Sequence, residues 1–178
     1  MERSISTSRI YDGRVVKLRV DKVILEDGQP ATREVVEHRG AAAIVPLLTD
    51  NQVVLVRQYR YPIGLELLEI PAGTLEINEA PYQCAMRELT EETGFACKEL
   101  TKILECYIAP GYSTEKIHFY LAKELTRSSA HPDEDERIKV EIIALPAVLE
   151  KIRKAKFVMP RPYARYSVHL TTYRFNPR

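Results

Sequence analysis

Three glutamates, Glu88, Glu91 and Glu92, lie within five consecutive positions. Residues 79–93 are expected to form a helix, in which side chains four positions apart share a face. Glu88 and Glu92 then lie one above the other with Glu91 beside them, and each like-charged pair destabilises a helix by about 0.2–0.5 kcal/mol. Carboxylate oxygens are the ligands that hard divalent cations such as Mg²⁺ prefer. The cluster therefore indicates a cation site.

The residues around the glutamates agree with this interpretation. The loop 71–73, Pro-Ala-Gly, precedes the helix, and its glycine lets backbone oxygens turn toward a ligand. Arg87 stands four positions before Glu91 and is expected to offset part of the repulsion. An apolar stripe that would anchor the helix on a core is formed by Tyr82, Ala85, Met86 and Leu89. A solvated acidic face is the alternative, because such faces are common on helices.

Residues 73–95 resemble the Nudix box, whose pattern is G-x5-E-x7-R-E-U-x-E-E-x-G-U, with U a bulky aliphatic residue. Every fixed residue type of the pattern is present, and Phe95 in the last aliphatic position is the one departure. The resemblance implies an enzyme that hydrolyses a nucleoside diphosphate linked to another group, with Mg²⁺ or Mn²⁺ as the metal. Bound metal would neutralise phosphate charge and lower the pKa of a bound water.

The same resemblance implies roles for individual residues. The metal ligands would be the backbone carbonyl of Ala72 and the carboxylates of Glu88, Glu91 and Glu92. Glu92 is also a candidate catalytic residue. Arg87 and Glu79 would orient the helix and the loop rather than touch the substrate. Glu76 has no role that the pattern assigns.

Segments outside the box are similar to the ADP-ribose pyrophosphatase branch of the family. They are a proline fifteen residues after Phe95, RQYRYP at 57–62, ATREVVEH at 31–38 and DEDE at 133–136. This similarity implies the substrate ADP-ribose and the products AMP and ribose 5-phosphate. Another nucleoside diphosphate sugar, such as GDP-mannose, or a dinucleotide remains an alternative, because the metal box is common to all of them.

Glu136 matches a mobile-loop glutamate that enzymes of this branch place near the attacking water, where it would act as a catalytic general base. The alternative is a solvated loop acid, with Glu134 as the second candidate for the base. Arg60, at the end of a predicted strand before the box, matches a substrate contact, and a guanidinium suits phosphate or ribose oxygens. The alternative for Arg60 is a surface arginine at a strand edge.

Arg33, Glu34 and Glu115 complete the set of candidate substrate-binding residues. Arg33 and Glu34 match positions that reach the nucleotide from an N-terminal hairpin. Related enzymes exchange this hairpin between subunits, so the resemblance implies a homodimer in which the two residues serve the partner's site. Glu115 either supports the metal or caps its turn.

The order of predicted elements indicates a mixed α+β fold. Strands are expected at 15–25, 31–38, 41–48, 52–60, 65–70, 103–108, 116–122 and 137–145, and a second helix at 146–156. Asn78 is a candidate N-cap of the first helix and Gly94 its C-terminal stop. The resemblance makes this a Nudix-type α-β-α sandwich around a mixed sheet. We expect a small N-terminal antiparallel β-hairpin subdomain over 1–38 and the hydrolase domain over 39–178.

Composition and charge limit the partners and the cellular compartment that we expect. The net charge of +1 favours no class of partner, and no apolar run is long enough to cross a membrane. The three cysteines lack the spacing of a zinc site or disulfide framework and indicate a reducing, cytoplasmic compartment. The alternative function is a non-catalytic Nudix-like module that binds a nucleotide or RNA. Residues 151–178 carry eight basic and no acidic residues, which could help such a module to bind nucleic acid. We expect no nucleic-acid partner, because such modules usually lose box glutamates.

Overall fold

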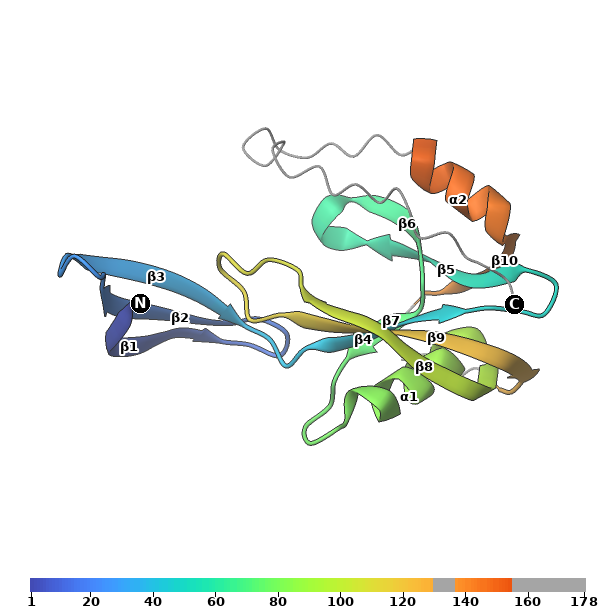
Figure 1. Cartoon of the computed structure of the whole chain (residues 1–178), viewed down its shortest axis with the longest axis horizontal. Helices are drawn as coiled ribbons and strands as arrows, with labels where there is room; N and C mark the ends of the chain where they lie inside the picture. The colour runs from blue at the N-terminus through green and yellow to red at the C-terminus, as the bar shows by residue number, and fades with distance from the viewer. Residues whose placement is uncertain (130–136, 155–178) are drawn as a thin grey trace. The chain divides into compact units, whose positions relative to one another are not determined.

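The structure, a computed structural model, describes residues 1–129 and 137–154 (Figure 1). The chain divides into one compact unit, Met1–Leu145, and a second that begins at Pro146. The strands are β1 (Arg3–Asp12), β2 (Lys17–Ile24), β3 (Pro30–Glu37), β4 (Ala41–Pro46), β5 (Gln52–Arg60), β6 (Leu65–Glu69), β7 (Ala72–Thr74), β8 (Phe95–Tyr107), β9 (Lys116–Arg127) and β10 (Lys139–Ala144). The helices are α1 (Pro81–Thr93) and α2 (Leu145–Lys154).

The N-terminal sheet has three antiparallel strands in the order β1-β2-β3 (Figure 1). The hairpin of β2 and β3 was predicted, and at its turn Gly28 has a φ of +83°. β1 was not predicted, because all of its residues are exposed and its sequence lacks the alternation of a half-buried strand. Its formation depends on pairing with β2, which runs from Arg3 opposite Ile24 to Asp12 opposite Lys17.

A four-stranded mixed sheet, β7-β4-β9-β8, carries the core. β4 pairs antiparallel with β7 and parallel with β9, so its apolar run is buried on both faces as predicted. β5 lies between β10 and β6 in a second sheet. β7 was expected to be loop, and β8 begins at Phe95 rather than at 103. Both differences arise because strand pairing extends into sequence with weak local strand signals.

α1 packs on β4, β7 and β8. The helix ends at Gly94, whose φ of +68° supplies the left-handed C-terminal conformation that glycine favours. The predicted N-cap Asn78 is wrong, because Ala80 occupies the N-cap position. The backbone N–H of Ala80 donates instead to Oε1 of Gln83 at 3.2 Å. Asn78 has a φ of +65°, so it forms the turn that leads into the helix.

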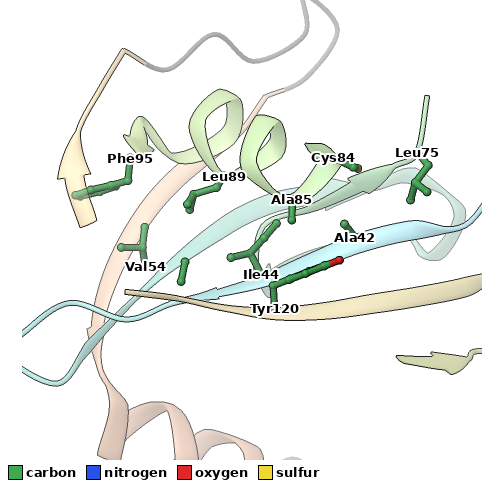
Figure 2. Packing of buried hydrophobic residues seen from close by; sticks show 10 residues of the cluster. Ala42, Ile44, Val54, Leu75, Cys84, Ala85, Leu89, Phe95 and Tyr120 are labelled. Atoms are coloured by element: carbon green, nitrogen blue, oxygen red, sulfur yellow. The ribbon is translucent and has the colours of Figure 1, made fainter. Parts of the chain in front are cut away.

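The core lies between α1 and the strands beneath it. Figure 2 shows Ala85 and Leu89 of α1 directed at Ala42 and Ile44 of β4. The predicted apolar stripe of α1 was partly wrong, since half of Tyr82 is exposed. The remaining members of the buried core are Val54, Leu75, Cys84, Phe95, Tyr120 and Ala122. A buried helix face of this kind fixes the direction in which the glutamates on the adjoining face project.

The predicted fold class is confirmed: a mixed sheet with a packed helix follows an antiparallel N-terminal sheet. α2 carries the basic side chains Lys151, Arg153 and Lys154 in its last turn, where the helix dipole favours positive charge. Among the described residues, no helix is long and apolar enough to cross a membrane. Glu134, Glu136 and most of the basic C-terminal segment lie outside the described residues.

Candidate active site

The loop before α1 is tied to the most buried strand of the sheet. In β7, Ala72 pairs opposite Ala43 of β4, and Gly73 opposite Ala42. The backbone N–H of Ile44 donates to the Pro71 carbonyl at 2.9 Å. Since α1 packs on the same strand, the loop and the helix are held in one fixed relation.

Glu88 and Glu92 lie against this loop and are almost buried, with exposed fractions of 9% and 5%. Oε2 of Glu92 accepts a hydrogen bond from the backbone N–H of Ala72 at 3.1 Å. Gly73 faces Glu88 so closely that a Cβ on this glycine would overlap the carboxylate. A buried charge needs compensating partners, so the loop and the two acids form one polar cluster.

Arg87 joins three acidic groups of α1 and the preceding loop into an ion-pair network. Its Nη1 donates to Glu88 at 2.8 Å and to Glu91 at 2.9 Å, which includes the expected i,i+4 pair. Its Nε and Nη2 donate to the two oxygens of Glu79 at 2.9 and 3.0 Å. These bonds lower the pKa of Glu79 to about 2 and raise the pKa of Arg87. Arg87 thus holds Glu79 on the loop and two glutamates on the helix in a single arrangement.

The glutamates face a cavity of about 860 Å³, the box cavity. Five of the candidate site residues line it: Ala72, Glu88, Glu91, Glu92 and Arg60. The Nε of Arg60 donates to Glu69 at 2.9 Å, which holds the guanidinium on this side of β5. The candidate metal ligands and Arg60, a candidate phosphate-binding residue, were predicted from separate parts of the sequence. They line the same cavity.

Three other candidates do not line the box cavity. Arg33 pairs with Glu2 within the N-terminal sheet, with Nη2 2.5 Å from Oε1. Glu34 lies on the exposed side of β3. The backbone N–H of Glu115 donates to Oγ of Ser113 at 3.1 Å within its own turn. Glu136 lies outside the described residues, so its predicted role stays a prediction.

The cavity also contains residues that the sequence analysis missed. They come from the turn between β1 and β2, the first residue of β2, the last residue of β3 and the segment that follows it: Gly13, Arg14, Val15, Lys17, Glu37, His38 and Arg39. Local sequence gives one signal for them, the run Glu-His-Arg-Gly between two strands. The N-terminal sheet therefore contributes to the same cavity as the glutamates.

Comparison with known proteins identifies the family. The profile described as the NUDIX domain matches residues 37–166. The profile described as the nucleoside diphosphate sugar hydrolase N-terminal domain matches residues 2–36. This chain belongs to the Nudix family.

Proteins similar to this chain include two kinds of pyrophosphatase and an activator of methanol dehydrogenase. The chain is 41% identical over 157 residues to the methanol dehydrogenase activator of Bacillus methanolicus, covering 87% of this chain and 85% of that protein. It is 39% identical over 153 residues to the ADP-ribose pyrophosphatase of Bacillus subtilis (strain 168), covering 85% and 83%. The GDP-mannose pyrophosphatase of Enterobacter sp. (strain 638) is 37% identical over 131 residues, covering 68% of each chain.

A solved structure described as an ADP compounds hydrolase superposes with a TM-score of 0.77 over 90% of this chain and 87% of that chain, at 24% identity. This likeness supports the fold. The predicted Nudix hydrolase, of the ADP-ribose and nucleoside diphosphate sugar pyrophosphatase type, is confirmed.

Nudix hydrolases generally use divalent metal ions, and the donor set here fits such an ion. Every candidate donor is an oxygen, and the absence of a side chain at Gly73 lets the Glu88 carboxylate lie against the loop. Among the described residues, no three acidic, histidine or cysteine side chains adopt the geometry of a metal centre. Arg87 donates to Glu88 and Glu91, and the Ala72 N–H donates to Glu92.

Gly73→Ala is expected to lower kcat/KM by more than about 10-fold with little loss of stability. The added methyl group must displace the Glu88 carboxylate, which is the movable end of a side chain. Losing one charged group from a polar site of this kind typically reduces rates by about 10- to 100-fold. Activity at several Mg²⁺ concentrations and thermal unfolding measure the two effects. Gly111→Ala is the control, because a Cβ there meets nothing within 4 Å. Equal activities of the two variants would contradict the prediction.

Glu79 is expected to make the fold sensitive to acid. Hydrogen bonds from Arg87, and one from the Glu76 N–H, lower its pKa from an ordinary 4.5 to about 2. Because the pKa is lower in the folded state, Glu79 stabilises the fold above about pH 4.5, and this stabilisation is lost as the pH falls toward 2. The contribution is at most about 3 kcal/mol.

Urea unfolding of the wild type and Glu79→Gln between pH 7 and pH 2.5 measures this contribution. The difference in unfolding free energy between the two should shrink as the pH falls. The exposed Glu99→Gln is the matched control and should follow the wild type. A constant difference between wild type and Glu79→Gln across the range would show that the prediction is wrong.

Proposed function

We propose that this Nudix hydrolase adds water across the pyrophosphate of ADP-ribose, with Mg²⁺, and releases AMP and ribose 5-phosphate. The observation that carries the proposal is the box cavity, in which Glu88, Glu91 and Glu92 share one space with Arg60. A diphosphate needs both partners, because a metal ion and a guanidinium neutralise different oxygens. The 39% identity to an ADP-ribose pyrophosphatase supports this substrate.

In this proposal, Glu88, Glu91, Glu92 and the Ala72 carbonyl hold the metal. When bound, the metal neutralises pyrophosphate charge and lowers the pKa of a coordinated water. Arg87 and Glu79 keep the glutamates and the loop in register through their ion pairs. Arg60 binds phosphate or ribose oxygens in a bidentate manner. Its pairing with Glu69 reduces the side-chain entropy lost when substrate binds.

The proton of the attacking water is assigned to a carboxylate. Glu92 is within the box cavity, and Glu136 is assigned by its match to the mobile-loop glutamate of the branch. A base that takes this proton in the transition state typically contributes about 10²- to 10⁴-fold to the rate. Glu136→Gln should therefore lower kcat more than it raises KM.

A homodimer is part of the proposal, with residues 1–38 as an N-terminal subdomain that completes the partner's site. Arg33 and Glu34 do not line the box cavity of their own chain, which supports this arrangement. β1 also exposes large apolar side chains, with Ile5 59% and Ile10 58% exposed. A subunit that pairs with this sheet would bury these two side chains.

Mixing two inactive variants tests the exchange. If Arg33 serves the partner's site, then a dimer of one Arg33→Ala subunit and one Arg60→Ala subunit contains one site with both arginines. Co-refolded mixtures should regain activity that neither variant has alone, and sedimentation should give a dimer. No recovery in a mixture shown to contain the mixed dimer would reject the exchange.

A second candidate substrate is GDP-mannose, because GDP-mannose pyrophosphatases are 35–37% identical to this chain. A panel of ADP-ribose, GDP-mannose and a dinucleotide, assayed for kcat/KM with Mg²⁺ or Mn²⁺, distinguishes the candidates. The proposal predicts the highest kcat/KM for ADP-ribose, with AMP and ribose 5-phosphate as products. A clear preference for GDP-mannose would reject the substrate, and no turnover of any compound would reject the proposed chemistry.

A further inference from the structure

The segment 36–40, between β3 and β4, is fixed by hydrogen bonds at its N-terminal end. The Val36 N–H donates to the Tyr112 carbonyl at 2.8 Å, and the Thr114 N–H donates to the Val36 carbonyl at 3.0 Å. The His38 N–H donates to Oγ1 of Thr114 at 2.9 Å. The segment is therefore anchored on the loop between β8 and β9.

The C-terminal end of the segment is anchored as well. The Gly40 N–H donates to Nδ1 of His38 at 3.0 Å, and the Leu75 N–H donates to the Gly40 carbonyl at 3.1 Å. The second bond connects the segment to the residue that follows β7, the strand that contains Ala72 and Gly73. Gly40 has a φ of +95°, so this path requires a residue without a side chain. The backbone is therefore fixed at His38 and at Gly40, on either side of Arg39.

Arg39 brings an uncompensated positive charge to the box cavity. Arg39 lines the cavity and is exposed, and its side chain makes no ion pair or hydrogen bond among the residues that the structure describes. Its acidic neighbour Glu37 is already neutralised, because it accepts hydrogen bonds from Arg9 and, at 2.5 Å, from Arg19. Arg60, in contrast, is paired with Glu69.

A second cation lies in the same part of the lining. Lys17 lies 3.1 Å from Asp12 in an ion pair whose members are both about half exposed, and such pairs contribute little. The N-terminal part of the cavity is therefore basic, whereas the part formed by β7 and α1 is acidic. Each phosphate of a nucleoside diphosphate sugar carries one negative charge, and the charge of a divalent cation held by three glutamates is already balanced by their carboxylates. The basic part of the cavity therefore offers a site for the phosphate oxygens.

We propose that Arg39 is a substrate-binding residue that grips the non-bridging oxygens of a nucleoside diphosphate in the box cavity. The inference rests on the proposed function, because it places the diphosphate in that cavity. The guanidinium provides two parallel N–H donors that match a phosphate, and its fixed backbone reduces the entropy lost on binding. An ammonium group replaces only the charge, so Arg39→Lys should restore part of the affinity.

Equilibrium binding and turnover test the proposal together. Calorimetry with ADP-ribose and Mg²⁺ is done in a Glu92→Gln background, which slows hydrolysis, and steady-state kinetics in the otherwise wild-type chain. Arg39→Ala should raise Kd and KM by about 10- to 100-fold and change kcat by less than about 3-fold. Arg39→Lys should lie between this variant and the parent. The control Lys98→Ala removes an exposed positive charge outside the cavity and should match the parent.

The outcomes separate this proposal from the proposed function. Binding that depends on Arg39 without turnover of the wild type rejects the proposed function and leaves the binding role of Arg39 standing. Normal turnover with Kd and KM of Arg39→Ala within 2-fold of the parent rejects the role of Arg39 alone. Equal losses in Arg39→Ala and Lys98→Ala would show a nonspecific charge effect and also reject it. A parent that binds neither ADP-ribose nor GDP-mannose rejects both.

Discussion

Glu92→Gln is expected to lower kcat/KM by about 10²- to 10⁴-fold while the protein stays folded. Glu92 lies in the box cavity with only 5% of its surface exposed. The amide has the same shape, and its oxygen can still accept the hydrogen bond from the Ala72 N–H. It carries no charge for a metal ion and cannot take a proton from water. The substitution should therefore lower the reaction rate and leave the packing unchanged.

Activity against Mg²⁺ concentration separates the two roles of Glu92. A lost metal ligand raises the Mg²⁺ concentration needed for half-maximal rate, whereas a lost base lowers the rate at saturating metal. Glu99→Gln removes an exposed carboxylate on β8 outside the cavity and should keep wild-type activity. Glu92→Gln activity within about 3-fold of the wild type would rule out both roles.

Arg87→Leu is expected to lower the free energy of unfolding by about 3 kcal/mol at pH 7 without metal. The change leaves Glu79, Glu88 and Glu91 without their shared partner, and the side chains of the first two are only 12% exposed. Buried charges without partners are strongly destabilising. For a chain of this length, the melting temperature should fall by roughly 6–12 °C.

Added Mg²⁺ should recover part of this stability, because a divalent cation bound to the folded state neutralises the same carboxylates. Urea unfolding with and without Mg²⁺ measures both effects, and Lys98→Leu controls for the loss of one exposed cation. A loss of less than about 1 kcal/mol would show that the network contributes little. Equal Mg²⁺ stabilisation of wild type and variant would show that Arg87 and the metal do not share their partners.

The sequence by itself predicted the candidate metal ligands. Glu88, Glu91 and Glu92 could be assigned because helical spacing is a local property, and the loop 71–73 because glycine and proline restrict the backbone locally. β4 was predictable for a similar reason, since a continuous apolar run is suited to burial on both faces. Gly94 ends α1 through its own φ preference.

Local sequence signals failed at β1, which depends on strand pairing, and at the N-cap of α1, for which two residues compete. β1 is polar and exposed, so only its pairing with β2 defines it as a strand. Asn78 is the better capping residue by type, but Ala80, two positions later, occupies the N-cap. The side chain of Gln83 accepts a hydrogen bond from the Ala80 N–H at this position. Such outcomes depend on partners that sequence spacing does not specify.

Only the tertiary structure decided which distant residues share the box cavity. Arg39 and Lys17 reach it because the segment 36–40 is hydrogen-bonded to the β8–β9 loop and to Leu75. Arg33, close to Arg39 in sequence, lies instead beside Glu2. The alternation of a single strand determines on which of its two faces a side chain lies. The register of paired strands and the connections between sheets determine which residues pack against that face. The sequence therefore predicted the candidate metal ligands, and the fold showed which cationic residues line the same cavity.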